Sequence, residues 1–174
     1  MVRPLWDETW FEMAKPLVER GTCLRRNYAA IIVAPGNVLV SSGYTGAPRG
    51  TPNCIDLGKC VREEMKIPSG QNYEKCRSVH GEQNAIINAN KVGSRSVAGC
   101  KMYIYGTDRK GNLPEICEPC MMCWRVIINA ELEEVITLSK AGIKVYSVAE
   151  RIKMLNEHPE IEFDAGYGTQ KKSQ

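Results

Sequence analysis

The sequence lacks the features that mark membrane and secreted proteins. No stretch approaches the roughly 20 consecutive apolar residues that a membrane-spanning helix needs. The first 20 residues carry Asp7, Glu8, Glu12 and Lys15 among their apolar residues, so they do not resemble the apolar region of a secretion signal. We therefore expect a cytoplasmic protein that does not bind membranes.

Aromatic residues and blocks of like charge are also scarce. Only 7% of the residues are aromatic, and 23 basic residues are spread among 20 acidic ones, for a net charge of +3. A groove for a polynucleotide is typically lined by basic residues interleaved with aromatic stacking platforms. The composition therefore argues against a polynucleotide and favours a small ligand.

Cysteine, in contrast, is abundant, with eight residues in the chain. Because the cytosol keeps thiols reduced, eight cysteines in a chain without an export signal indicate metal binding or catalysis rather than a disulfide framework. Burial as a small apolar side chain is the simpler interpretation for an isolated cysteine such as Cys100.

The hydrophobic pattern predicts helices and strands in the order α β β α β α β β α. Helical spacing and end signals predict helices over residues 7–20, from residue 80 to near Gly93, over 120–130 and from 147 to about 158. Short apolar runs predict strands over residues 29–34, 38–42, 102–105, 134–138 and 143–146. We expect one α/β domain over residues 1–166, with helices on both faces of a mixed sheet, and a disordered tail over 167–174.

Two parts of this pattern are irregular. Pro16 lies in what should be the interior of the first helix, so we expect a kink, or a helix that starts later than a cap at Asp7. Residues 43–71 are rich in Gly, Pro and Cys and have neither a helical nor a strand period. A loop of this length inside a compact domain is usually functional or held by an additional interaction.

Two short motifs each open a predicted helix. One is His80-Gly81-Glu82, and the other is Pro119-Cys120-Met121-Met122-Cys123. In a Cys-x-x-Cys at the start of a helix both sulfurs face one side and can reach the same ion. His80 would supply a third ligand. A fourth tetrahedral position would stay open for water, which is typical of a catalytic zinc site.

Glu82 has the position of a proton shuttle rather than of a ligand. It is two residues from His80, about 200° around an ideal helix, so it does not lie beside the ligand. A carboxylate there could take a proton from the metal-bound water and deliver protons to the reacting groups of a substrate. Alone, Cys120 and Cys123 could be a redox pair or half of a structural zinc site, but the two motifs together favour catalysis. The other histidine, His158, fits an exposed position near the end of the last helix.

The motifs and their surroundings resemble the deoxycytidylate (dCMP) deaminase family of the zinc-dependent cytidine deaminase superfamily. The similarity runs through residues 6–146, in TCLRRNYAAIIVA, SSGYTGAPRGTPNC, CVREEMKIPSG, EKCRSVHGEQNAII and EPCMMCWRVIINA. The resemblance implies a three-layer α/β/α sandwich and hydrolysis of dCMP to dUMP and ammonia. It also implies that His80, Cys120 and Cys123 bind catalytic Zn²⁺ and that Glu82 is the proton shuttle.

Family members often carry a second metal outside these motifs. Cys23, Cys54, Cys60 and Cys76 are available here as thiolate ligands of a structural zinc, which would hold the long Gly/Pro-rich loop in place. The spacing between Cys54 and Cys60 is wider than in a zinc knuckle, so four free thiols are the alternative.

The sequence departs from the family in three places. The usual His-Ala-Glu is His-Gly-Glu, and Gly81 would enlarge or loosen the base pocket. The Asn of a Gly-Tyr-Asn-Gly motif, which helps bind the effectors dCTP and dTTP in regulated members, is Thr45 here, and this argues against such regulation. The link before the helix predicted over residues 120–130 is longer than in the family, over residues 108–115. It would form either a substrate-selecting lid or a solvated loop.

Contacts to the rest of the substrate are indicated only by position in the chain. Arg25 and Arg26 precede the first strand and could pair with a 5′-phosphate or form a solvated face. Thr45, Gly81 and Pro119 are further candidates for substrate contact. Two other functions stay open: deamination of another nucleotide, nucleoside or nucleic-acid base, and a non-catalytic module stabilised by zinc.

The helix predicted over residues 120–130 also bears on assembly. It is strongly apolar and offers more surface than one face of a sheet needs, through Trp124, Val126, Ile127 and Ile128. Because members of the family assemble, we expect a homo-oligomer. Burial of the helix within a monomer would explain the same residues.

Overall fold

The computed structural model describes residues 2–68, 71–91 and 96–159. The main elements are α1 (Trp6–Glu19), β1 (Arg26–Ala34), β2 (Val38–Tyr44), α4 (Gly81–Lys91), β3 (Lys101–Asp108), α5 (Met121–Asn129), β4 (Glu134–Ser139), β5 (Gly142–Ser147) and α6 (Val148–Glu157). Their order is the predicted one. The long segment between β2 and α4 contains the short helices α2 (Cys54–Leu57) and α3 (Val61–Glu64) and the 3-10 turn η1 (Tyr73–Lys75).

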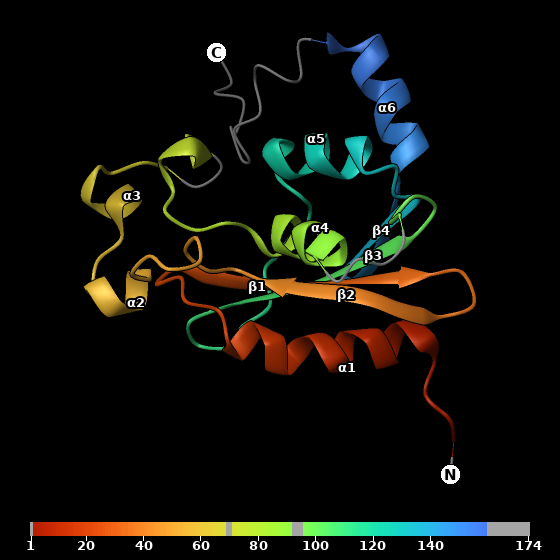
Figure 1. The fold of residues 1–174 in the computed structure, drawn as a ribbon, viewed down its shortest axis with the longest axis horizontal. Coiled ribbons are helices and arrows are strands. Elements are labelled where there is room, and N and C mark those ends of the chain that lie inside the picture. Colours follow the sequence, from red (N-terminus) through yellow and green to blue (C-terminus); the bar gives the residue numbers. More distant parts are fainter. Residues whose placement is uncertain (1, 69–70, 92–95, 160–174) are drawn as a thin grey trace.

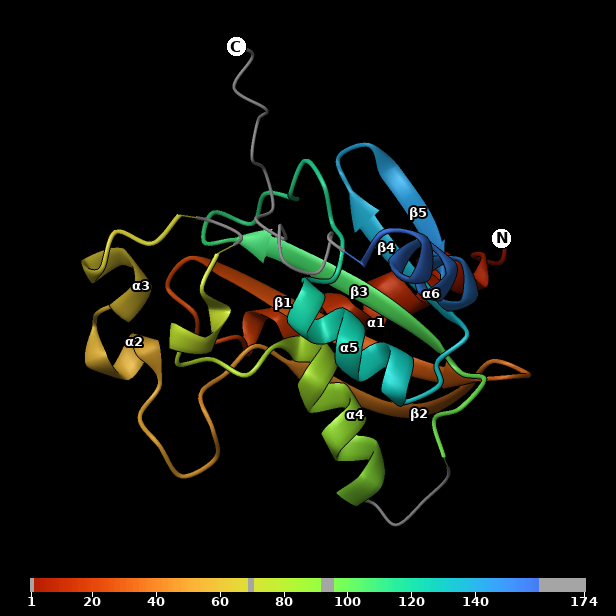
Figure 2. The same cartoon turned by 90° about the horizontal axis from the view of Figure 1, so that it is seen from above.

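The strands form one mixed five-stranded sheet in the order β2-β1-β3-β4-β5. Of the neighbouring pairs, β3 and β4 are parallel and the others are antiparallel. A parallel pair needs a crossover connection, and α5 supplies it between β3 and β4. Helix α1 covers one face of the sheet, while α4, α5 and α6 lie over the other face (Figures 1 and 2). The predicted α/β/α sandwich is confirmed.

Strand β1 is buried on both faces, and its alternation defines two cores. Ala29, Ile31 and Val33 pack with the apolar side of α1, whereas Ala30 and Ile32 pack with α4 and α5. Successive side chains of a strand point to opposite faces. Tyr28 therefore points to the same side as Ala30, toward the two helices that begin with the motifs, and it packs against that core.

Helix α4 is held tightly against β2. A side chain at Gly43 would collide with the backbone of α4 at Ala85. The side chain of Asn84 donates to the carbonyl of Tyr44 at 2.8 Å, and that of Asn88 donates to the carbonyl of Ser42 at 2.7 Å. These contacts place the start of α4 relative to the sheet.

The ends of the elements correct two local expectations. Helix α1 is capped at Leu5 rather than Asp7, whose carboxylate instead accepts a hydrogen bond from the hydroxyl of Tyr103 at 2.7 Å. It begins earlier than Asp7, not later, and continues through Pro16. Burial of the apolar side of α1 against the sheet offsets the missing backbone donor. The predicted cap of α6 is confirmed, since Ser147 Oγ accepts from the backbone N–H of Glu150.

Two expectations fall on undescribed parts of the chain. The end of α4 near Gly93 and the tail over residues 167–174 lie outside the described residues. Within the described ranges, no helix combines the length and the apolar character that a bilayer-crossing segment needs.

Candidate metal centre

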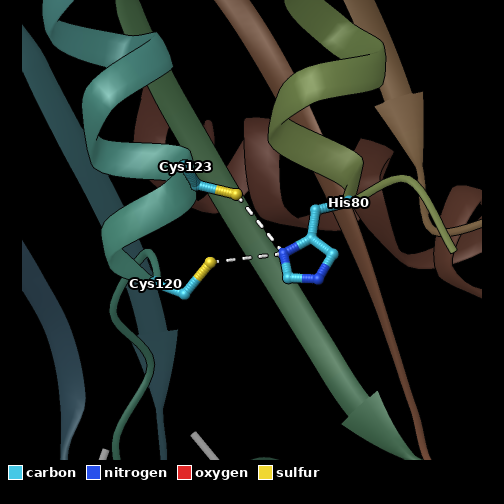
Figure 3. Close-up of side chains that lie close together, drawn as sticks. All are labelled: His80, Cys120 and Cys123. Carbon is cyan, nitrogen blue, oxygen red and sulfur yellow. Dashed lines mark hydrogen bonds between the residues drawn. The ribbon is translucent and has the colours of Figure 1, made fainter. Parts of the chain in front are cut away.

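Three of the predicted ligands meet between the starts of α4 and α5 (Figure 3). His80 immediately precedes α4, Cys120 is the N-cap of α5, and Cys123 lies in the first turn of α5. Nδ1 of His80 is 3.5 Å from Sγ of Cys120 and 3.3 Å from Sγ of Cys123. Among the described residues, this is the single group of three or more metal-binding side chains whose ligand atoms lie within 4.8 Å of one another.

The spacing of the three donor atoms fits a tetrahedral Zn²⁺ ion. Zn–S bonds of about 2.3 Å and Zn–N bonds of about 2.0 Å place sulfur and nitrogen about 3.5 Å apart at the tetrahedral angle. The distances of 3.5 and 3.3 Å are close to this value. Thiolate and imidazole donors are those that zinc prefers, and three of them leave one coordination position free.

The two thiols differ in acidity because they share a hydrogen bond. This bond to Cys123, together with His80, lowers the pKa of Cys120 to about 4. The same bond and burial raise the pKa of Cys123. The start of a helix also favours a negative charge, which supports ionisation of Cys120. The lowered pKa of Cys120 favours its thiolate form, the form that binds a metal.

Glu82 lies beside this donor set. It is in the first turn of α4, only 6% of its surface is exposed, and its carboxyl is hydrogen-bonded to the side chain of Cys123. Burial raises the pKa of Glu82, and the neighbouring His80 opposes the shift. A carboxyl whose pKa is raised toward the working pH is suited to take up and release protons.

Gly81 allows a close approach of two backbones and does not loosen the site. A Cβ atom at this position would lie 2.7 Å from the carbonyl oxygen and 3.1 Å from the carbonyl carbon of Tyr28. The space expected beside the base pocket is therefore filled by β1. The expectation that His-Gly-Glu enlarges the pocket is wrong for this reason.

Gly81→Ala should lower the free energy of unfolding by about 1–3 kcal/mol, because the added methyl group must displace either α4 or β1. Gly46→Ala is the control, since a Cβ atom there meets its nearest neighbour at an ordinary 3.5 Å. Chemical denaturation of both variants measures the difference. Equal stabilities would show that β1 and α4 separate without cost.

Tyr28 and Cys117 belong to the surroundings of the site, although the sequence analysis did not single them out. The ring of Tyr28 packs on Gly106, its register partner in β3. Burial raises the pKa of Tyr28 to about 12, and the charges that influence it include Cys117, Arg26 and Glu82. Burial likewise raises the pKa of Cys117 to about 12. The alternation of β1 could have indicated Tyr28, whereas no local signal marks Cys117.

The two arginines that are candidates for binding the 5′-phosphate have different surroundings. Nε of Arg25 lies 3.6 Å from a carboxylate oxygen of Glu63 in α3, and the Arg25 side chain is 28% exposed. Arg26 is exposed and lines a cavity together with residues of the 108–115 link, among them Asp108 and Asn112. The structure therefore separates two arginines that the sequence treats alike.

Thr45 and Pro119 are part of the framework around the site. The hydroxyl of Thr45 accepts from the backbone N–H of Tyr28 at 3.1 Å and donates to its carbonyl at 3.2 Å. The side chain of Pro119 is fully buried next to Cys120. A contact of either residue with the substrate stays a prediction.

The four remaining candidate ligands gather in one region without forming a ligand group. Burial raises the pKa of Cys54, and charge on the nearby thiols of Cys23, Cys76 and Cys60 raises it further. Within the described ranges their sulfur atoms do not form a group at metal-binding distances. Cys76 is instead hydrogen-bonded to His80, a contact that lowers the pKa of Cys76 against the effect of burial. His158 is exposed beyond the end of α6.

An α/β/α sandwich with one histidine and two cysteines at the starts of two neighbouring helices defines the class of zinc-binding deaminases. Residues 4–139 match the family model described as the cytidine and deoxycytidylate deaminase zinc-binding region. The chain belongs to this family.

Similar proteins include several deoxycytidylate deaminases. That of Schizosaccharomyces pombe is 30% identical over 136 residues, and the match covers 77% of this chain but only 37% of the yeast protein. That of Mycobacterium phage D29 is 28% identical over 140 residues, 78% of this chain and 96% of the phage protein. The crystal structure of dCMP deaminase from cyanophage S-TIM5, in complex with dCMP and dUMP, shares the fold. Its TM-score is 0.52 at 20% identity, and the match covers 79% of this chain and 83% of that chain.

Proposed function

We propose that this protein hydrolyses dCMP to dUMP and ammonia, with Zn²⁺ held by His80, Cys120 and Cys123 and with Glu82 as the catalytic acid and base. The observation that carries the proposal is the buried Glu82 carboxyl beside three donor atoms with tetrahedral spacing. A zinc site with a purely structural role has no use for such a carboxyl. The activity named for the related proteins supports dCMP as the substrate.

The chain's own residues perform the proton transfers. When bound, Zn²⁺ would act as a Lewis acid that activates a water molecule. Glu82 accepts a proton from the attacking water and donates it to N3 of the cytosine. As the C4–N bond breaks, Glu82 carries the second proton of the water to the departing amino group, which leaves as ammonia. His80, Cys120 and Cys123 hold the ion, and the thiolate character of Cys120 favours this role.

Arg26, rather than Arg25, is the proposed contact for the 5′-phosphate. Arg25 is paired with Glu63, whereas Arg26 lies at the exposed start of β1 and lines the cavity under the 108–115 link. Arg26 and Tyr28 are two residues apart on β1, so their Cα atoms are about 7 Å apart along the strand and their side chains point to the same face, where they are hydrogen-bonded to each other. A substrate whose base lies near Tyr28 and Glu82 would thus extend its phosphate toward Arg26.

The 108–115 link is an ordered turn beside this cavity. The carboxylate of Asp108 accepts hydrogen bonds from the backbone N–H groups of Lys110 and Asn112 and from the side chain of Asn112, all within 2.9 Å. These bonds hold the pKa of Asp108 below its usual range. We propose that this turn forms one wall of the phosphate site.

Arg26→Ala should raise KM for dCMP by about 10- to 100-fold, because a hydrogen bond to a charged group is worth about 1.5–3 kcal/mol. KM for deoxycytidine, which has no phosphate, should not change. Arg3→Ala, which removes an exposed arginine that lies before α1 and outside this turn, is the control. An equal change for both substrates would show that Arg26 acts on the fold rather than on the phosphate.

The proposed reaction is tested by ammonia release and the ultraviolet change with dCMP, CMP, deoxycytidine and cytidine, each with and without dCTP. Preferential turnover of dCMP would support the proposal, and preferential turnover of another compound would change the substrate. Binding of zinc without turnover of any of the four would favour a non-catalytic module. Because Thr45 replaces the usual asparagine, we expect dCTP to have no effect.

A second, structural Zn²⁺ at Cys23, Cys54, Cys60 and Cys76 stays a prediction. Their gathering in one region supports it, and the hydrogen bond between Cys76 and His80 supports the alternative of free thiols. Zinc analysis decides between them. Two ions per chain, falling to one in Cys60→Ser, would support the structural site.

Assembly into a homo-oligomer also stays a prediction. Trp124 and Ile127, which suggested a surface for assembly, are fully buried within the chain. Sedimentation or light scattering measures the oligomeric state directly. The single domain over residues 1–166 and the cytoplasmic location likewise remain predictions.

A further inference from the structure

Two side chains from the last elements of the sandwich reach the turn that precedes α5. The hydroxyl of Tyr146, in β5, donates to the carbonyl of Cys117 at 3.3 Å. Nη1 of Arg151, in α6, lies 3.5 Å from a carboxylate oxygen of Glu118. The first contact holds the backbone of Cys117 and the second holds the side chain of Glu118, both just before Cys120, which is one of the three proposed ligands.

Arg151 also contacts the residues that follow Cys120. Its Nη2 lies 2.7 Å from the sulfur of Met121 in the first turn of α5, and its guanidinium lies 5.2 Å from the ring centre of Trp124. Trp124 is fully buried and packs edge-on against Tyr146. Arg151 therefore contacts residues on both sides of Cys120, in the preceding turn and in α5.

The pair of Arg151 and Glu118 is shielded from water. The side chains are 16% and 22% exposed, and Nε of Arg151 is buried without a hydrogen-bond partner among the described residues. When one member of a poorly solvated pair is removed, the other keeps its desolvation cost, so such pairs are sensitive to loss of a partner. A planar guanidinium also has a more directional set of donors than an ammonium group.

The chain between the pair and the ligand is short and stiff. One residue, the fully buried Pro119, separates Glu118 from Cys120, and the proline ring fixes its φ angle. Movement of Glu118 would therefore be passed on to Cys120. The match to the family model ends at residue 139, so Tyr146 and Arg151 lie beyond the matched segment.

We propose that Arg151 is a positioning residue for the metal centre: by holding Glu118 and Met121, it fixes Sγ of Cys120 relative to His80 and Cys123. This inference rests on the part of the proposed function that assigns Zn²⁺ to these three ligands, and it does not depend on the substrate. Residues that orient metal ligands without binding the metal typically contribute 10- to 100-fold to metal affinity.

The test compares metal binding in Arg151→Ala, Arg151→Lys and the control Lys153→Ala, which removes a cation that is 76% exposed on the same helix. Competition with a chelator should show a 10- to 100-fold weaker Zn²⁺ affinity for Arg151→Ala and no change for Lys153→Ala. The absorption bands of bound Co²⁺ should shift in Arg151→Ala, because they report the geometry of the thiolate ligands. Arg151→Lys should restore part of the affinity.

A folded Arg151→Ala protein with wild-type Zn²⁺ affinity and an unchanged Co²⁺ spectrum would overturn the inference. If Arg151→Ala does not fold, Glu118→Gln tests the same contact with a side chain of the same shape. It should weaken Zn²⁺ binding and shift the Co²⁺ bands, and unchanged values would again overturn the inference. If Arg151→Ala weakens zinc binding but the zinc-loaded wild type deaminates no cytosine compound, the proposed function alone would be refuted.

Discussion

Glu82→Gln should reduce kcat for deamination by about 10²- to 10⁴-fold while zinc stays bound. The amide has nearly the same shape as the carboxyl, so the packing of α4 against the sheet should be preserved. It cannot accept a proton from water and pass it to N3 of the base. Glu82 is not one of the three donor residues, so removal of its charge leaves the donor set in place.

The control for this variant is Glu133→Gln, which makes the same chemical change at an exposed position before β4. Ammonia release, zinc content and the free energy of unfolding should be measured for both. At neutral pH Glu82→Gln should be at least as stable as the wild type, because an ionised carboxylate is costly to bury. Retention of more than a tenth of the activity would exclude Glu82 as the proton shuttle.

Cys123→Ala should abolish binding of the catalytic zinc, and deamination with it. Cys123 is fully buried, and its sulfur is one of three proposed donors, so the remaining two cannot complete the site. Zinc per chain, measured after gel filtration in a weak chelator, should fall by one ion. Activity should fall to the uncatalysed rate.

Cys100→Ala is the matched control for this loss. Cys100 is 2% exposed in the same core, and it does not belong to the metal-binding group, so its replacement removes a buried sulfur without removing a ligand. Both variants should lose a similar amount of packing energy, and Cys100→Ala alone should keep its zinc and its activity. Full zinc content in Cys123→Ala would contradict the proposed ligand set.

Features that depend on neighbouring residues could be predicted from the sequence. The turn between β1 and β2 follows from Pro35, Gly36 and Asn37, of which the last two adopt the positive φ angles that a tight hairpin turn requires. The start of α6 follows from the hydroxyl of Ser147 three residues before Glu150. The two motifs are equally local, because each places its chemical groups within one turn of a helix.

Features that depend on contacts between distant segments could not be predicted in this way. The role of Asp7 is one example, because its carboxylate accepts a hydrogen bond from the hydroxyl of Tyr103 in β3 instead of capping α1. The same is true of Arg26, which is distinguished from Arg25 only by the neighbours that surround each guanidinium. Tyr28 approaches Glu82 because β1 passes beneath the start of α4.

The sequence by itself determined the order of the main elements, the mixed α/β class, and the residues that can bind a metal and move protons beside it. These features follow from periodicity, turn residues and side-chain chemistry. Only the tertiary structure decided that Gly81 serves a close backbone contact, that Arg25 pairs with Glu63, and that Arg151 contacts the turn before α5. The physical reason is that these interactions join residues up to tens of positions apart. Their distances are set by how the layers of the sandwich pack, not by any local pattern.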